Sequence, residues 1–89
     1  MLRPDYTSRF KKDYQQAIKR GLNISLVDAV IRDLIGEVPL AAARKDHALS
    51  GEYIGCRECH IKPDLLLVYQ VGNGVIVFER MGTHSDLFR

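Results

Sequence analysis

The first half of the chain shows two stretches with apolar residues at helical spacing. The first stripe has apolar positions at i, i+4, i+7 and i+8: Phe10, Tyr14, Ala17 and Ile18. This spacing keeps the apolar side chains on one face of a helix. Ser8 or Thr7 can cap the helix, which we expect to run to about Arg20, and Gly21 follows as a stop signal.

A second helix is predicted over Leu26–Ile35. Its buried face consists of five apolar residues: Leu26, Val27, Val30, Ile31 and Leu34. Ser25 followed by Asp28 is a variant of the capping box, and Gly36 and Pro39 end the periodic pattern. Because the connection between the two helices is short, we expect them to form a hairpin.

The second half of the chain favours strands. Apolar runs and turn residues predict three strands: Ile54–Ile61, Leu65–Val71 and Val75–Met81. Pro63-Asp64 fits the first turn, and Gly72-Asn73-Gly74 contains the Asn-Gly pair of a hairpin. Leu2–Asp5 is expected to add an edge strand, since Pro4 lacks the N–H that a central strand needs.

Residues 39–53 form a long connection between the helices and the strands. Ala41–Arg44 is expected to form one helical turn within it, and His47 is expected in a loop. The predicted fold is therefore α+β, with an N-terminal helical hairpin packed on one face of a small antiparallel sheet. We expect residues 1–89 to form a single domain, since 89 residues leave no room for a second.

Composition adds few constraints. Thirteen basic and 11 acidic residues give a net charge of +2, which permits a nucleic-acid partner without arguing strongly for one. Five basic residues surround the first apolar stripe: Arg9, Lys11, Lys12, Lys19 and Arg20. They form either a solvated face or a contact to ribosomal RNA phosphates, and both interpretations stay open. No apolar run follows Met1, so we expect no signal peptide, and Leu65–Tyr69 is too short to span a bilayer.

Three histidines, His47, His60 and His84, all fall in the second half of the chain. Four charged residues accompany them: Glu58, Asp64, Arg80 and Asp86. In the predicted meander, Asp64 and His84 lie at one end of the sheet with His60 nearby, whereas His47 is not placed by sequence alone. Taken singly, each histidine is more often a surface or packing residue than a catalyst.

Histidine and carboxylate together suit the cleavage of RNA by its own 2′-hydroxyl group. That reaction needs a base for the hydroxyl proton and an acid for the leaving 5′-oxygen, and imidazole can serve as either near neutral pH. A carboxylate can orient the imidazole, and Arg80 could stabilise the charge on the phosphate. This chemistry requires no metal ion and no other cofactor.

Cys56-Arg-Glu-Cys59-His60 matches the string to which c-type haem is attached, and it could also supply zinc ligands. Within a strand, however, Cys56 and Cys59 point to opposite faces. Two buried free thiols are therefore the favoured interpretation, and reduced thiols are typical of the cytoplasm.

Three blocks of the sequence resemble the YafQ branch of the RelE/ParE toxin superfamily. Lys45-Asp46-His47-Ala48-Leu49-Ser50-Gly51 is similar to its Lys-Asp-His-x-Leu-x-Gly segment. Residues 57–69 resemble its central block with His-x-x-Pro-Asp followed by an apolar strand, and residues 78–88 resemble its closing block. The resemblance implies a RelE-like fold and the toxin of a type II toxin–antitoxin pair.

The resemblance also implies an activity and partners. Such toxins enter the A site of the ribosomal 30S subunit and cut the messenger RNA there. The implied partner is a ribbon–helix–helix antitoxin, and the pair would bind operator DNA only through that antitoxin. No membrane partner is implied. By motif, the family's catalytic positions fall on four residues: His47, His60, Asp64 and His84. Arg80 and Phe88 fall on substrate-binding positions, and Glu58, where the family often has Asp, is grouped with them.

The fold alone does not separate an RNA-cutting toxin from a gyrase-binding toxin of the ParE branch. The histidines favour RNA cleavage, because gyrase poisoning needs no general acid or base. A non-catalytic relative that only pairs with an antitoxin, and a small metalloprotein that uses Cys56, Cys59 and His60, remain as alternatives.

Overall fold

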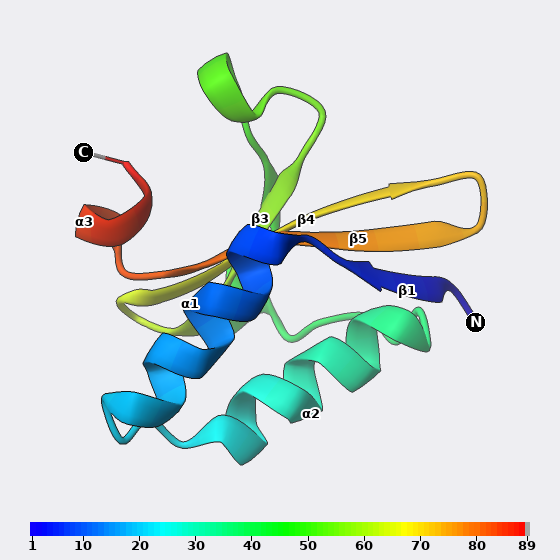
Figure 1. Ribbon diagram of the computed structural model, residues 1–89. Helices are drawn as coiled ribbons and strands as arrows, with labels where there is room; N and C mark the ends of the chain where they lie inside the picture. Colours follow the sequence, from blue (N-terminus) through cyan, green and yellow to red (C-terminus); the bar gives the residue numbers. More distant parts are fainter. Residues whose placement is uncertain (89) are drawn as a thin grey trace.

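The computed structural model describes residues 1–88 and shows a five-stranded sheet with two helices on one face (Figure 1). The strands are β1 (Arg3–Tyr6), β2 (His47–Ala48), β3 (Arg57–Lys62), β4 (Leu65–Gly72) and β5 (Val75–Gly82). Their order across the sheet is β1-β5-β4-β3-β2. The predicted α+β class and the central meander are confirmed, but β1 runs parallel to β5, so the sheet is mixed.

The helical hairpin consists of α1 (Ser8–Lys19) and α2 (Ile24–Ile35). Thr7 caps α1 by accepting a hydrogen bond from the N–H of Phe10 at 3.0 Å, which confirms one of the two predicted caps. The predicted capping pair of α2 is wrong. Asn23 is the N-cap residue and α2 begins at Ile24, two residues before the predicted start. The hydroxyl of Ser25 binds the Asn23 side chain instead of a backbone N–H.

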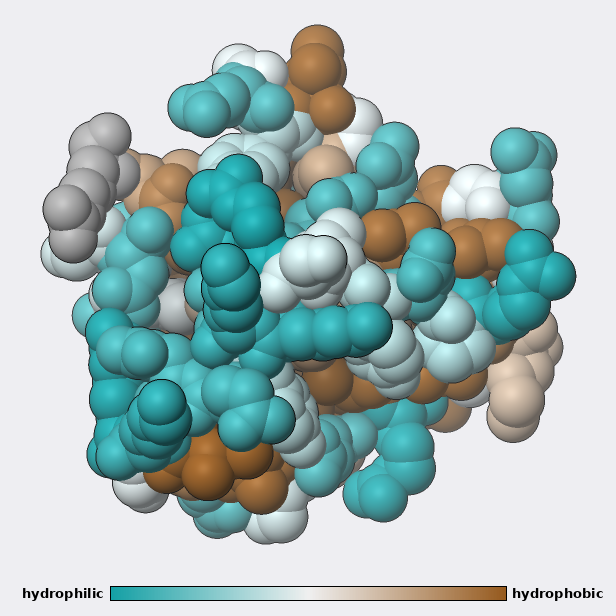
Figure 2. All heavy atoms as spheres, viewed as in Figure 1, coloured by the Kyte–Doolittle hydropathy of each residue, from teal (hydrophilic) through white to brown (hydrophobic). Residues whose placement is uncertain are grey.

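The larger core lies between the helices and the sheet. It is built from buried apolar residues of α1, α2 and the central strands: Phe10, Ala17, Val27, Val30, Ile31, Leu34, Cys59, Ile61, Leu65, Leu67, Tyr69, Ile76, Phe78 and Met81. Phe78 of β5 is fully buried and stacks near Tyr6, with ring centroids 5.3 Å apart. The outer face of α1 is hydrophilic, as the front of the molecule in Figure 2 shows.

A smaller core covers the opposite face of the sheet. Cys56, Leu66, Val68 and Leu87 form it, with the partly buried Leu49 and Tyr53. Leu87 belongs to the short helix α3 (His84–Leu87), which follows β5. Among residues 1–88, no helix is long and apolar enough to cross a membrane.

The connection before the sheet is more ordered than predicted. The expected helical turn is present as a 3-10 turn, η1 (Ala42–Arg44), and a second turn, η2 (Gly51–Tyr53), follows. The placement of His47 in a loop is wrong, since His47 pairs with Glu58 in the two-residue strand β2. The predicted strand Ile54–Ile61 begins only at Arg57, because Gly55 turns the chain at a φ of 92° and Ile54 is exposed.

Candidate functional site

The three histidines lie in a row although they come from β2, β3 and α3. The ring centroids of His47 and His60 are 6.5 Å apart, and those of His60 and His84 are 6.1 Å apart. His60 occupies the middle because β3 lies between β2 and β4. Asp64, directly before β4, accepts a hydrogen bond from the backbone N–H of His84 and so holds α3 on the other side of His60. The expected proximity of Asp64, His60 and His84 is confirmed, and β2 brings His47 to the same row.

Glu58 is a buried carboxylate between two of these histidines. Its side chain is only 5% exposed, and its Oε1 lies 3.5 Å from His47 Nε2 and 3.7 Å from His60 Nε2. An ionised carboxylate only accepts hydrogen bonds, so each contact is attractive when the facing Nε2 carries a proton. Glu58 contacts both rings because it lies two residues before His60 on the same face of β3 and pairs with His47 of β2.

Backbone carbonyls fix the other nitrogen of both rings. His47 Nδ1 lies 2.6 Å from the carbonyl oxygen of Lys45, and His60 Nδ1 lies 3.3 Å from that of Pro63. Since a carbonyl oxygen is only an acceptor, Nδ1 carries the proton in each contact. A neutral ring then has no proton on Nε2, the nitrogen that faces Glu58, so both contacts of one ring are attractive only in its doubly protonated form.

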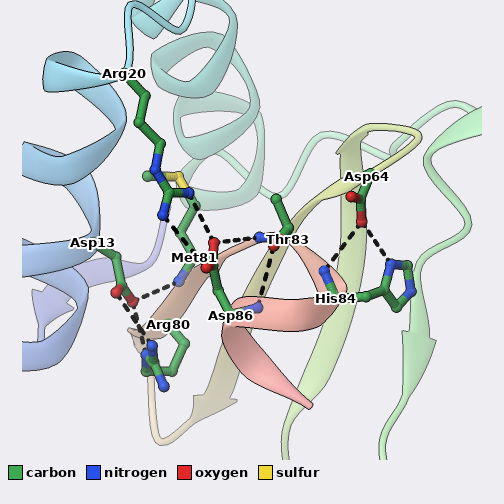
Figure 3. Close-up of polar contacts among 8 residues, drawn as sticks. All are labelled: Asp13, Arg20, Asp64, Arg80, Met81, Thr83, His84 and Asp86. Carbon is green, nitrogen blue, oxygen red and sulfur yellow. Dashed lines mark hydrogen bonds and ion pairs between the residues drawn. The ribbon is translucent and has the colours of Figure 1, made fainter. Parts of the chain in front are cut away.

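The third histidine is oriented by Asp64. The Oδ1 of Asp64 lies 2.8 Å from His84 Nδ1 and accepts the backbone N–H of His84 at 3.1 Å (Figure 3). The hydrogen bond from the His84 ring, together with the backbone bond, holds the pKa of the Asp64 carboxyl below its usual value. Both side chains are exposed, by 58% for His84 and 66% for Asp64. Among residues 1–88, His84 Nε2 has no hydrogen-bond partner, so it is open to an incoming molecule.

Phe88 and Arg80 differ in how close they lie to this row. The Phe88 ring is 6.3 Å from the His84 ring and 5.6 Å from the Tyr53 ring, so it continues the row. Arg80 instead binds Asp13 of α1, with Nε 2.8 Å and Nη2 3.2 Å from the carboxylate oxygens. The hydrogen bonds that Arg80 donates to Asp13 raise the pKa of Arg80, to which a hydrogen bond with the Tyr53 hydroxyl also contributes.

Sequence reasoning missed the polar contacts that support α3. Asp86 caps this helix together with Thr83 and binds Arg20 of α1 (Figure 3). The signal for the cap was present, because Thr83-His-Ser-Asp86 has the spacing of a capping box. No signal in the sequence pairs Arg20 with Asp86, or Asp13 with Arg80.

The two cysteines lie on opposite faces of the sheet, as predicted. Cys59 is part of the helix-side core and Cys56 of the smaller core. Burial raises the pKa of both thiols, that of Cys59 to about 12. Their separation argues against a shared metal or haem, and no group of three or more His, Cys, Asp or Glu side chains among residues 1–88 is arranged to hold a metal ion.

Comparison with known proteins gives one consistent family. The family model described as the bacterial toxin of type II toxin–antitoxin system, YafQ, matches residues 2–89. The chain is 36% identical over 85 residues to the mRNA interferase toxin YafQ of Escherichia coli. The aligned region covers 94% of this chain and 92% of the relative.

Solved structures agree with this family over the whole fold. The structure superposes on YafQ in the crystal structure of the Escherichia coli DinJ–YafQ complex with a TM-score of 0.93, at 34% identity and full coverage of both chains. A metal-bound toxin from Helicobacter pylori is 42% identical, with a TM-score of 0.91 over 99% of this chain and 100% of that chain. These likenesses confirm the RelE-like fold expected from the sequence.

Proposed function

The chain belongs to the YafQ family of bacterial toxins of type II toxin–antitoxin systems, and we propose that it is an endoribonuclease that cuts messenger RNA. The observation that carries this proposal is the Asp64–His84 pair, which leaves His84 Nε2 open beside the ring of His60. The Escherichia coli relative named as an mRNA interferase toxin supports the substrate class.

In the proposed reaction, an RNA phosphate lies against the row of histidines. One imidazole takes the proton of the ribose 2′-hydroxyl, whose oxygen attacks the phosphorus atom. A second imidazole donates a proton to the 5′-oxygen as the P–O bond breaks, which yields a cyclic 2′,3′-phosphate and a 5′-hydroxyl. His84 is the main acid or base, because its Nε2 is exposed and its Nδ1 is fixed by Asp64. His60 and His47 assist it.

The remaining predicted residues have supporting roles in this proposal. Phe88 stacks against a base next to the cleaved bond, since its ring is partly exposed and continues the row of rings. Arg80 uses two of its N–H groups on Asp13, and the guanidinium has others that can bind a phosphate oxygen. Glu58 is buried and acts through His47 and His60 rather than on the RNA directly. Protein side chains thus supply the acid, the base and the cation, so the reaction as proposed needs no metal ion.

The weak net charge of +2 bears on where the message is cut. A protein that captures free RNA by charge alone usually has a larger basic excess. We therefore propose that the ribosome presents the message to the toxin in the A site of the 30S subunit, in the cytoplasm. The exposed basic side chains of α1 would face ribosomal RNA in that position.

The proposed partner is a ribbon–helix–helix antitoxin, through which the pair binds operator DNA. Support comes from the Escherichia coli relative, which has been solved as a complex named DinJ–YafQ. Co-purification with the product of a neighbouring small reading frame tests this partner directly.

The decisive experiment compares the wild-type chain with the His84→Ala variant after induction in bacteria. Primer extension on a translated message should show cuts for the wild-type chain, and these cuts should disappear when translation is blocked. We expect His84→Ala to lower cleavage by about 10²- to 10⁴-fold, the usual contribution of a general acid or base. Circular dichroism of the purified variant must show that it remains folded.

Two outcomes would overturn the proposal. A folded His84→Ala variant that cuts as fast as the wild-type chain would remove His84 from the reaction. An intact message together with broken or under-supercoiled DNA would point to the gyrase-binding alternative.

A further inference from the structure

Helix α3 carries His84 and is too short to hold its own shape. It spans only four residues, His84–Leu87, and an isolated helix of this length is unstable in water. A capping box closes its first turn: Asp86 Oδ2 accepts the N–H of Thr83 at 2.9 Å, and Thr83 Oγ1 accepts the N–H of Asp86 at 3.2 Å. The carboxylate of Asp86 is therefore the centre of the turn that positions His84.

The same carboxylate is tied to helix α1. Arg20, the C-cap residue of α1, donates from Nη1 to Asp86 Oδ2 at 3.0 Å, and its Nη2 lies 3.5 Å from Oδ1 (Figure 3). This ion pair, together with the capping box, holds the pKa of Asp86 at about 2. Arg20 and Asp86 are 66 residues apart in the chain, so the pair fixes the end of the chain to its first helix.

The backbone of β5 confines Asp86 from a third side. A Cβ atom added at Gly82 would lie 2.9 Å from both Cβ and Oδ2 of Asp86, which is closer than real contacts of this kind. The absence of a side chain at Gly82 thus makes room for the carboxylate. Arg20, Thr83 and Gly82 together leave Asp86 little freedom to move.

The ring of His84 depends on this arrangement because its own pair with Asp64 is the more exposed of the two ion pairs. The side chains of His84 and Asp64 are 58% and 66% exposed, against 44% and 27% for Arg20 and Asp86, and the more exposed pair restrains its side chains less. Phe88 depends on the same helix, since its N–H donates to the carbonyl oxygen of His84 at 2.8 Å. Movement of α3 would therefore shift both the open Nε2 of His84 and the neighbouring aromatic ring.

We propose that Arg20 and Asp86 are positioning residues, which clamp α3 to α1 so that His84 stays paired with Asp64 and faces the RNA. Neither residue takes part in proton transfer. This inference rests on the proposed role of His84 in cleavage, and its structural part can be measured without any cleavage assay.

The test uses Arg20→Gln, Asp86→Asn and the double variant. The two single substitutions change the net charge in opposite directions. An effect on RNA binding through charge alone would therefore move the cleavage rate in opposite directions, whereas a shared positioning role lowers it in both. We expect kcat to fall about tenfold in each, with KM little changed, because small displacements of catalytic groups cost rates of this order. The kcat of the double variant should be no lower than that of the less active single variant, because both substitutions break the same contact.

Arg32→Gln serves as the matched control. Arg32 is exposed on α2, and its substitution removes the same charge as Arg20→Gln without touching α3. Arg20→Lys keeps a cation near Asp86 and should recover part of the lost rate. Gly82→Ala perturbs the Arg20–Asp86 contact while leaving both charged residues in place. The added methyl group should displace Asp86 and lower kcat in the same way.

The structural readout is the titration of the Asp64 carboxyl, followed by carbon-13 NMR. Its pKa should rise towards the usual value in Arg20→Gln and Asp86→Asn, because the hydrogen bond from His84 is loosened, and should stay low in Arg32→Gln. The charge of Asp86 itself raises the pKa of Asp64, so its loss in Asp86→Asn acts in the opposite direction, and a rise in that variant reports the loosened hydrogen bond. An unchanged Asp64 titration together with unchanged kcat overturns the clamp. If Asp64 shifts as expected but even the wild-type chain cuts no RNA, the clamp stands and the proposed function fails.

Discussion

Replacing Asp13 by Asn should destabilise the fold through one ion pair between α1 and β5. The Asp13 carboxylate accepts three hydrogen bonds: from Arg80 Nε at 2.8 Å, from Arg80 Nη2 at 3.2 Å and from the N–H of Met81 at 3.0 Å. The side chains of Asp13 and Arg80 are only 17% and 13% exposed. Asn keeps an oxygen that can accept one of these bonds, but it removes the charge that faces the guanidinium.

The degree of burial sets the expected magnitude. Breaking a fully buried ion pair costs about 3–5 kcal/mol, and an exposed pair contributes about 0–1 kcal/mol. The Asp13–Arg80 pair is largely shielded from water, so we expect the free energy of unfolding to fall by about 2 kcal/mol. For a domain of this size, such a loss corresponds to a fall in Tm of about 10 °C.

Urea unfolding followed by circular dichroism measures this loss. A cycle of Asp13→Asn, Arg80→Met and the double variant separates the pair from the other contacts of each residue. We expect a coupling free energy of about 2 kcal/mol, close to the whole effect of Asp13→Asn. Additive effects of the two substitutions, or a loss below about 0.5 kcal/mol for Asp13→Asn, would refute the reasoning.

Three further predictions concern acid stability, thiol reactivity and the core. The pKa of Asp86 is about 2 in the folded chain against 3.8 as its ordinary value, so the ionised carboxylate contributes to the stability of the fold above about pH 4, and this contribution is lost as the pH falls to 2. After allowance for solvent screening the contribution is about 1 kcal/mol, and urea titrations at each pH should show that the Asp86→Asn variant lacks this part of the acid transition. Cys59, whose pKa is raised to about 12 by burial, should react with iodoacetamide only after unfolding, and rapid labelling of the native chain would contradict its placement. Phe78→Ala should lower the free energy of unfolding by about 3–5 kcal/mol in the same urea assay, since the ring is fully buried, and a loss below about 1 kcal/mol would mean that it packs elsewhere.

The elements that could be predicted from the sequence are those whose burial repeats over several residues. The apolar stripe of α1 and the runs of β4 and β5 are long enough to define a face, and Asn73-Gly74 marks the turn between the last two strands. The antiparallel connection of these strands then brings Asp64 beside His84, which is why the sequence predicts that the two residues lie at one end of the sheet. The spacing of Cys56 and Cys59 predicted their opposite faces for the same reason.

Short or non-local features could not be predicted in this way. Strand β2 has only two residues, so no pattern identifies it, and the place of His47 beside Glu58 depends on pairing with β3. The apolar side chain of Ile54 suggested a strand, but Gly55 and the turn η2 redirect the chain there. The Arg20–Asp86 pair joins residues whose charges are common on any protein surface, and only the packing of α1 beside the end of β5 brings them together.

The histidines in the row are held by unequal supports, and this difference bears on which part of the site is most easily disturbed. His47 and His60 each have Nδ1 at the backbone carbonyl of a turn residue and Nε2 near the buried Glu58 of β3, so each ring is contacted at both ends. His84 has one exposed carboxylate and a helix of four residues near the end of the chain. Substitutions at distant residues should therefore reach the reaction mainly through His84. The other two rings should keep their positions unless the sheet itself unfolds.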